Sequence, residues 1–388
     1  MKGHIAKKGN RYYIVINMGK DEVSKKRILK WMPGGYDRKK DAEKVLPDIL
    51  SSINHGTFVE PTDDTFGSLM ATWLQEKKSE VRPGTWKSYA WLVNMHLIPH
   101  LGHIKLMKLE PKHLRDLYHE ILFKKKGIAA ASIRKLHVLV MDALNRAVEW
   151  RKIPYNMAAV VKLPQGKAEK FEVWDEEQLK LFLDEAIKDQ YFIIFELAAS
   201  TGMRQSEILG LRWKDVDLQA GRISVRQAYT KGESGHEMSD TKTEKSVRSI
   251  ALFPETVEFL KQHKANQNEH HMRNRKLYQD HGLVAQSGFG TPVNPRNLMR
   301  NYYKILKIIH EHHAVPKVRF HDLRHTHATI LLKRGVHPKI VQERLGHSSI
   351  NVTLDTYSHV LPNLQEAVLK NIGDSILGER LLTKLLTP

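Results

Sequence analysis

The stretch HDLRHTHATILLKRGVHPKIVQERLGHSSINVTLDTYSH, residues 321–359, guides the interpretation of the whole chain. Apolar residues recur through it at helical spacing, and Gly335 and Pro338 interrupt them, which predicts short helices. Three polar features follow in order: H-x-x-R at its start, L-G-H at 345–347, and Tyr357. Imidazole, guanidinium and phenol groups brought together can hold, protonate and attack a phosphate. The stretch therefore indicates chemistry on a phosphate.

The composition indicates a polyanionic partner. The 388 residues suffice for two or three domains, and 62 Lys+Arg against 43 Asp+Glu give a formal net charge of +19. This balance favours nucleic acid over a membrane, the alternative being a soluble protein that is merely basic. The chain has no cysteine, which excludes disulfides, thiolate zinc sites and a cysteine nucleophile. Neither a signal peptide nor a membrane-length apolar run is evident, so we expect a soluble, cytoplasmic protein.

Residues 1–55 are expected to form a separate basic module with a net charge of +7. The segments RYYIVINMG and RILKWM are rich in strand-forming residues, and a helix is expected from Asp37 or Arg38, with Pro47 inside it. Such a basic sheet could lay strands in a DNA groove. The alternative is a protein-binding or purely structural unit.

Residues 63–163 are expected to form a domain of four or five helices. Asp63 or Asp64 is predicted to cap the first helix, and the last is predicted at 131–150. Lysines and arginines lie between the apolar positions and predict a basic outer face. The alternative is an ordinary solvated helix face. The candidate DNA-binding residues are Lys124, Lys125, Lys126, Arg134 and Lys135.

A charged linker at 164–171 precedes a larger domain at 172–388. Asp175 is predicted to cap its first helix, and an apolar helix at 192–200 is expected to end at Gly202. Apolar residues then alternate with polar ones in RISVRQAY and SVRSIAL, which predicts antiparallel strands. The remainder is predicted to be helical. The expected fold class is mainly α with small β-sheets (α+β).

Two further segments contain candidate site residues. Arg204 lies just past a helix end, where the free N–H groups of the next helix also favour an anion, and Glu207 is close enough to orient it. The alternative is a surface salt bridge. Lys242 precedes a strand and could act as a proton donor, with Lys245 as a competitor. The alternative is a solvated lysine.

The histidines and the tyrosine are individually ambiguous. His321 and His325 are four residues apart and could hold a metal, but Asp322 stands where a zinc-protease motif needs glutamate. His347 could simply cap a helix, and Tyr357 could simply be half-buried packing.

Taken together, these features resemble the tyrosine recombinase family, the phage-integrase type in particular. The matching sequence motifs are T-G-M-R-x-S-E-I-L-G-L, T-K-T-x-x-S-x-R, H-D-L-R-H-T-H-A-T, L-G-H-S-S and D-T-Y-S-H. The resemblance is close over residues 172–360, looser over 63–163, which resemble the core-binding helical domain, and weak over 1–55, which resemble the arm-binding sheet.

The resemblance implies roles residue by residue. Arg204 and Arg324 match the arginines that hold the scissile phosphate, Tyr357 matches the nucleophile, and Glu207 matches a supporting acid. A phenol with a pKa near 10 is a poor nucleophile, and the cationic groups would stabilise charge as it attacks. Guanidinium charge takes the place of a metal, so no metal or other cofactor is expected.

The remaining roles concern protons. By the same resemblance Lys242 is the general acid for the leaving 5′ oxygen, His321 a proton acceptor or phosphate ligand, and His347 a donor to the phosphate. His327 stands where many relatives have an aromatic residue, and the sequence offers no interpretation of it.

The implied function is a site-specific DNA recombinase, an integrase of a phage or integrative element, acting through a 3′-phosphotyrosyl intermediate. Its implied partners are core-type and arm-type double-stranded DNA sites, a homotetramer on DNA, and DNA-bending and directionality proteins, at the nucleoid of a bacterial host. Alternatives are a resolvase-like enzyme or topoisomerase, a non-catalytic DNA-binding regulator, and a metal-dependent nuclease. An apolar helical stripe at 372–388 could pack on its own domain or on a neighbouring subunit.

Overall fold

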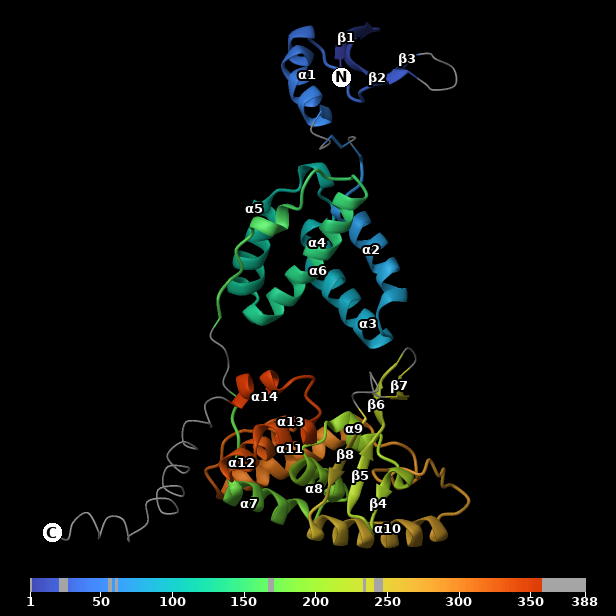
Figure 1. Ribbon diagram of the computed structural model, residues 1–388, viewed down its shortest axis with the longest axis vertical. Helices are drawn as coiled ribbons and strands as arrows, with labels where there is room; N and C mark the ends of the chain where they lie inside the picture. The colour runs from blue at the N-terminus through green and yellow to red at the C-terminus, as the bar shows by residue number, and fades with distance from the viewer. Residues whose placement is uncertain are drawn as a thin grey trace, which may run out of the picture. The chain divides into compact units, whose positions relative to one another are not determined.

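A computed structural model shows a mainly helical chain with small antiparallel sheets, as expected from the sequence (Figure 1). The chain divides into two compact units, Met1–Ala168 and Glu169–Pro388. The apolar stripe predicted at 372–388 lies outside the part of the chain that is described. The structure describes residues 2–20, 27–54, 58–59, 62–166, 171–232, 235–240 and 247–357.

Among these residues, no helix combines the length and apolar character needed to cross a bilayer.

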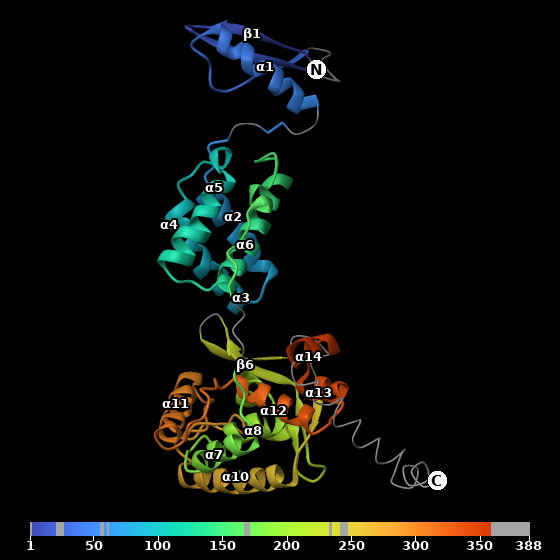
Figure 2. The same cartoon turned by 90° about the vertical axis from the view of Figure 1, so that its left-hand side faces the viewer.

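The first unit begins with a three-stranded antiparallel sheet in the order β1-β2-β3. Helix α1 packs along this sheet, and Ile14, Ile16 and Ala42 are buried between them (Figure 2). The two predicted strands and the helix are confirmed, whereas the first strand, KGHIAKK, was not predicted because its apolar residues are few. The elements are β1 (Lys2–Lys8), β2 (Arg11–Lys20), β3 (Arg27–Trp31) and α1 (Lys39–Asn54).

The rest of this unit is a helical body around its own apolar core, which includes Phe66, Trp73, Tyr118 and Leu144. The Trp73 indole donates a hydrogen bond of 2.8 Å to Asp142, which joins the first and last long helices of the body. The elements are α2 (Phe66–Glu80), α3 (Pro83–Leu92), η1 (Val93–Leu97), α4 (Ile98–Leu101), η2 (Leu106–Lys108), α5 (Pro111–Asp116), η3 (Leu117–Lys125), α6 (Ala130–Glu149) and η4 (Met157–Val160).

The predicted cap of α2 is wrong. Thr65, not Asp63 or Asp64, caps this helix, because its hydroxyl accepts a hydrogen bond of 3.1 Å from the Ser68 amide. The two aspartates form ion pairs with lysines instead, at 2.5 and 2.8 Å. Thr65 was not among the predicted caps, and both predicted aspartates pair with lysines.

The second unit surrounds an aromatic core that includes Trp174, Phe182, Phe195 and Tyr302. Asp175 caps α7 as predicted, accepting a hydrogen bond of 2.8 Å from the Gln178 amide. The helical elements are α7 (Glu176–Ala186), α8 (Phe192–Thr201), α9 (Gln205–Leu209), η5 (Trp213–Asp215), α10 (Pro254–Arg273), α11 (Pro295–His312), α12 (Asp322–Lys333), α13 (Pro338–Leu345) and α14 (Ile350–Tyr357).

The segment RISVRQAY divides between two sheets, which the sequence did not predict. Its first half joins a sheet in the order β4-β5-β8, and its second half forms a β6-β7 hairpin that projects away from α10 (Figure 1). The second half begins at Gln227. The buried side-chain amide of Gln227 donates a hydrogen bond of 2.7 Å to the Gly210 carbonyl. The strands are β4 (Val216–Asp217), β5 (Arg222–Val225), β6 (Gln227–Lys231), β7 (His236–Asp240) and β8 (Arg248–Ala251).

The described part of the opening stretch, residues 321–357, forms three short helices, as its interruptions predict. Helix α12 ends before Gly335, Pro338 begins α13, and Gly346 ends α13 with a φ of 68°. The helices pack around a small apolar cluster that includes Leu332, Val341 and Tyr357. The polar residues of the opening motif thus lie on neighbouring short helices.

Candidate active site

The site begins where α8 meets α9. The apolar helix α8 ends at Gly202, which has a φ of 65°, and a Cβ there would lie 2.7 Å from Leu345 and 2.8 Å from His327. Only glycine fits this close approach in a left-handed conformation. The turn places Arg204 at the N-cap of α9, with its side chain partly exposed.

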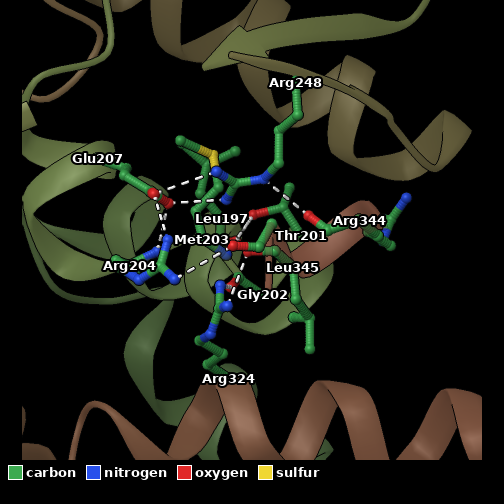
Figure 3. A network of polar contacts seen from close by, with 11 residues as sticks. Leu197, Thr201, Gly202, Met203, Arg204, Glu207, Arg248, Arg324, Arg344 and Leu345 are labelled. Atoms are coloured by element: carbon green, nitrogen blue, oxygen red, sulfur yellow. Dashed lines mark hydrogen bonds and ion pairs between the residues drawn. The ribbon is translucent and has the colours of Figure 1, made fainter. Parts of the chain in front are cut away.

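Glu207 joins two arginines. Its carboxylate accepts hydrogen bonds from Arg204 Nη1 at 2.8 Å and from Arg248 Nη1 and Nη2 at 3.1 and 2.8 Å (Figure 3). Burial alone would raise the pKa of Glu207, but the hydrogen bonds and charge of Arg248, aided by Arg204, outweigh it and lower that pKa to about 2. Glu207 is therefore a buried carboxylate that holds both guanidinium groups in place.

Arg324 reaches the same place from α12. Its Nη1 donates to the Gly202 carbonyl and its Nη2 to the Leu345 carbonyl, both at 2.7 Å. Burial and the nearby charge of Arg204 lower the pKa of Arg324 to about 9, so it stays charged at neutral pH. A guanidinium has five N–H donors, so donors remain for a ligand such as phosphate.

The three arginines meet at the C-terminal end of α13. The carbonyls of residues 344, 345 and 346 each accept a hydrogen bond from a different one: Arg248 at 2.9 Å, Arg324 at 2.7 Å and Arg204 at 3.4 Å (Figure 3). The last carbonyls of a helix have no partners within it and carry partial negative charge. This helix end therefore gathers side chains from α9, β8 and α12 into one cationic cluster.

His347 follows directly on this helix end. Its Nδ1 lies 2.8 Å from the Thr353 hydroxyl on α14. Burial lowers the pKa of His347 to about 4, and the charges of Arg324 and Arg204 act in the same direction. The ring is neutral at pH 7 and is held beside the arginine cluster.

Tyr357 ends α14 and is completely buried. Its hydroxyl lies 2.8 Å from Nδ1 of His325, and its ring meets the edge of Phe171 at 6.1 Å. Burial raises the pKa of Tyr357 to about 12, with the charge of Arg324 acting weakly in the opposite direction. The tyrosine is therefore within the electrostatic reach of Arg324, one member of the arginine cluster.

The other predicted site residues differ in placement. His321 stands at the N-cap of α12 with an exposed side chain and contacts the His325 ring edge-on at 5.5 Å. Lys242 and its competitor Lys245 lie outside the described residues. The structure thus brings together Arg204, Glu207, Arg324, His347 and Tyr357, with His321 at their border.

The predicted DNA-binding residues belong to the other unit. Lys124 and its two lysine neighbours close η3, and Arg134 and Lys135 lie on α6. All five side chains are exposed, and Lys124 forms an ion pair of 2.8 Å with Glu120.

Sequence reasoning missed residues that complete the cluster. Arg248 is the last residue of the T-K-T-x-x-S-x-R motif but was assigned no role, and His325 was considered only as a metal ligand. Within the described residues, no group of three or more His, Asp or Glu side chains could hold a metal ion. His327 is buried between the Ala199 carbonyl, 2.8 Å from its Nδ1, and Arg344 Nε, 3.0 Å from its Nε2.

Comparison with known proteins identifies the family to which the chain is similar. Residues 172–363 match the model of the "Phage integrase family", and residues 65–122 match "Phage integrase, N-terminal SAM-like domain". A "Tyrosine recombinase XerC-like" protein of Caldanaerobacter subterraneus subsp. tengcongensis is 30% identical, over 96% of this chain and 98% of that protein.

Solved structures show the same fold. The Tn1549 transposon integrase in complex with transposon right end DNA has a TM-score of 0.66 and 22% identity, covering 79% of this chain and 99% of that one. A lambda integrase tetramer bound to a Holliday junction has a TM-score of 0.57 and 16% identity, covering 89% and 92%. From the family match and the relative that spans nearly its whole length, the chain belongs to the phage integrase family of tyrosine recombinases, enzymes of site-specific DNA recombination.

Proposed function

We propose that this recombinase cleaves and rejoins DNA through a 3′-phosphotyrosine at Tyr357, and that it integrates and excises a mobile element. The observation that carries the proposal is the convergence of Arg204 and Arg324 on the end of α13, with Tyr357 in reach of the charge of Arg324. Fixed donors of this kind stabilise the charge that develops on a pentacoordinate phosphate. Glu207 supports the cluster by holding Arg204.

In this proposal the remaining groups manage protons and orientation. His347 donates to the phosphate, Lys242 protonates the leaving 5′ oxygen, and His321 binds the phosphate or accepts a proton. Attack by the phenol conserves the phosphodiester energy in the phosphotyrosine, so a DNA hydroxyl can reverse the step without ATP. The similarity to a transposon integrase and the basic composition support action on an integrative element.

Three modules share the work in the same proposal: residues 1–55 bind arm-type DNA, residues 63–163 bind core-type DNA, and residues 172–388 perform the chemistry. In the first module, Lys8 lies over the ring of Trp31 at 5.7 Å, and Trp31 is exposed. An exposed aromatic ring beside a lysine suits contact with a nucleic acid. The division is tested by footprinting on attachment-site DNA. Variants in residues 1–55 and variants in residues 63–163 should each lose protection of a different DNA segment, whereas loss of the same segment in both would contradict the division.

The active form in this proposal is a homotetramer on DNA in the bacterial cytoplasm, with bending and directionality proteins as further partners. The lambda integrase, which has the same fold, is a tetramer in its complex with a Holliday junction. Crosslinking on the element's attachment-site DNA tests this, with tetramers as the expected product and monomers alone as the contradicting one.

The nucleophile is tested with a nicked duplex that carries the element's attachment site and traps the covalent adduct. Tyr357→Phe is expected to abolish the adduct and to leave DNA affinity unchanged. Tyr303→Phe serves as the control, because Tyr303 is an exposed tyrosine on α11 of the same unit. An adduct that persists with Tyr357→Phe overturns the assignment.

A metal-dependent nuclease is the competing chemistry, and EDTA separates the two. Guanidinium charge replaces a metal in the proposed mechanism, so cleavage is expected to persist in EDTA. Loss of cleavage in EDTA, restored by a divalent cation, supports the nuclease instead.

A further inference from the structure

The two histidines of the H-x-x-R-H segment stand in different relations to the nucleophile. His325 Nδ1 lies 2.8 Å from the Tyr357 hydroxyl, whereas His321 meets the His325 ring in a T-shaped contact at 5.5 Å. Resting on the proposed role of Tyr357, we propose that His325 is a catalytic residue, the general base that accepts the phenolic proton as Tyr357 attacks the phosphate. This moves the proton acceptor from His321, the sequence-based candidate, to its neighbour one turn along α12.

The His325 ring is held so that Nδ1 faces the phenol. Phe171 stacks on it with ring centroids 4.4 Å apart and an interplanar angle of 21°, and it also meets Tyr357 edge-on. Stacking on one face and an edge contact from His321 restrict rotation of the imidazole. The hydrogen bond is therefore set by packing before any DNA arrives, as a positioned base requires.

The surroundings favour a neutral, accepting imidazole. Burial lowers the pKa of His325 to about 4, and the charges of His321, Arg324 and Arg319 act in the same direction while Asp322 opposes them. His347 also lies within electrostatic reach. At neutral pH the ring is uncharged, and a hydroxyl that donates to Nδ1 requires the tautomer with its proton on Nε2.

The phenol needs such an internal acceptor. Tyr357 is completely buried, and burial raises its pKa to about 12, so bulk water cannot take the proton from it in place. Among the described residues, His325 is the hydrogen-bond partner of this hydroxyl. A nearby phosphate would also favour the imidazolium that forms, because opposite charge raises the pKa of a histidine.

The step balances without a further reactant. The Tyr357 oxygen forms a bond to phosphorus, the bond from phosphorus to the 5′ oxygen breaks, and the phenolic proton moves to Nδ1 of His325. The departing 5′ oxygen takes a proton from a separate donor, for which Lys242 is proposed. In rejoining, the 5′ hydroxyl attacks phosphorus and gives its proton back to the group that had protonated the 5′ oxygen. The bond from phosphorus to the Tyr357 oxygen breaks, and His325 returns its proton to the phenolate.

The test measures single-turnover formation of the covalent adduct on the nicked attachment-site duplex between pH 4 and 9, a range that reaches the pKa of about 4 of His325. The variants are His325→Asn, which keeps a hydrogen-bond acceptor near Nδ1 but cannot take a proton, and His325→Ala. Both are expected to lose about 100- to 10,000-fold in rate at pH 7, the usual contribution of a general base. Their DNA affinity should match the wild type, which also verifies folding, and His312→Asn, an exposed histidine on α11, is the control.

Two readouts separate a base from a residue that merely packs. The wild-type rate should fall at acid pH as His325 is protonated; this fall should persist in His321→Asn and disappear in the His325 variants, whose rates should instead rise with pH. A duplex with a bridging 5′ sulfur has a leaving group that needs no acid, because thiols ionise far more readily than alcohols. That duplex should not restore the His325 variants, since their defect is in activating Tyr357.

Several results would overturn the inference. They are a wild-type rate in His325→Asn, an unchanged acid limb in the His325 variants, or full rescue by the sulfur-containing duplex. An adduct formed by Tyr357→Phe would instead refute the proposed nucleophile. The two failures are distinguishable because the first leaves Tyr357 as the attachment site.

Discussion

Arg248 and Glu207 form a buried, two-pronged ion pair with N–O distances of 3.1 and 2.8 Å, and both side chains are less than a tenth exposed. The carboxylate also accepts a hydrogen bond from Arg204, so one acid holds two guanidinium groups side by side. Without Glu207, the buried Arg248 and the partly exposed Arg204 would face each other as two like charges. The pair is therefore the support on which the cationic cluster depends.

The first prediction concerns the stability that Glu207 provides. Glu207→Ala should lower the free energy of unfolding by about 3–5 kcal/mol, because it leaves Arg248 buried without its counter-charge. Urea unfolding followed by tryptophan fluorescence measures the change. Glu258→Ala is the control, since Glu258 forms an exposed pair with Lys261 that contributes about 0–1 kcal/mol at most. Equal losses in both variants would show that the buried pair has no special role.

The second prediction concerns acid sensitivity through His327. Burial, with the charge of Arg344, lowers the pKa of His327 to about 3, whereas the unfolded chain has a value near 6.5. The unfolded state therefore binds more protons between these values, and stability falls as pH drops from about 6.5 towards 3. His327→Phe should remove about one proton from this linkage, or about 1.4 kcal/mol per pH unit between pH 6 and 4.

Unfolding curves at pH 7, 6, 5 and 4 measure this slope. The slope is compared within each protein, so any constant loss of stability from removing the contact with Arg344 cancels. His312→Phe, on an exposed position, should keep the wild-type slope. Parallel curves for wild type and His327→Phe would contradict a neutral, buried His327.

The third prediction concerns Arg324, which bridges two carbonyls 143 positions apart in the chain, those of Gly202 and Leu345, with both bonds at 2.7 Å. A lysine has one ammonium and cannot form this planar bridge while also offering a fork to phosphate. Arg324→Lys should slow adduct formation by about 100- to 1,000-fold and leave DNA affinity unchanged. The exposed Arg296→Lys is the control. Wild-type cleavage by Arg324→Lys would exclude a bidentate role.

The fourth prediction concerns the basic surface of the helical body. Lys125 and Arg134 are exposed, and if each neutralises one DNA phosphate, the double alanine variant should weaken binding on all sequences. The slope of log K against log salt should become shallower by about 0.9 for each lost contact. Lys180→Ala, an exposed lysine of the other unit, should leave the slope unchanged. An unchanged slope in the double variant would remove these residues from the DNA interface.

Local patterns predicted the helices and their ends. The apolar spacing in α8 and the glycine at its end, the Asp175 cap of α7, and the breaks at Gly335 and Pro338 are all signals within a few residues, and each is confirmed. Strand β1 and the Thr65 cap were not predicted, because their local sequence signals are weak. Strand pairing decides the first and ion pairs of the neighbouring aspartates bear on the second.

The features of the site likewise fall into those that local sequence patterns indicated and those that depend on long-range contacts. The order of motifs in the sequence was enough to single out Arg204, Arg324, His347 and Tyr357, and to pair Glu207 with Arg204 three residues away. What the sequence could not provide is the partner of each group at long range. Arg248 and Glu207 are 41 positions apart, and His325 and Tyr357 are 32 apart.

The sequence by itself therefore determined the fold class, the family and the candidate site residues in the stretch at 321–359, because periodicity and motif spacing are local properties. Only the tertiary structure decided that the end of α13 gathers three arginines, and that the Tyr357 hydroxyl meets His325 rather than His321. The physical reason is that two side chains four residues apart on a helix look equivalent in sequence. Packing against Phe171 and α14 makes one of them the neighbour of the phenol.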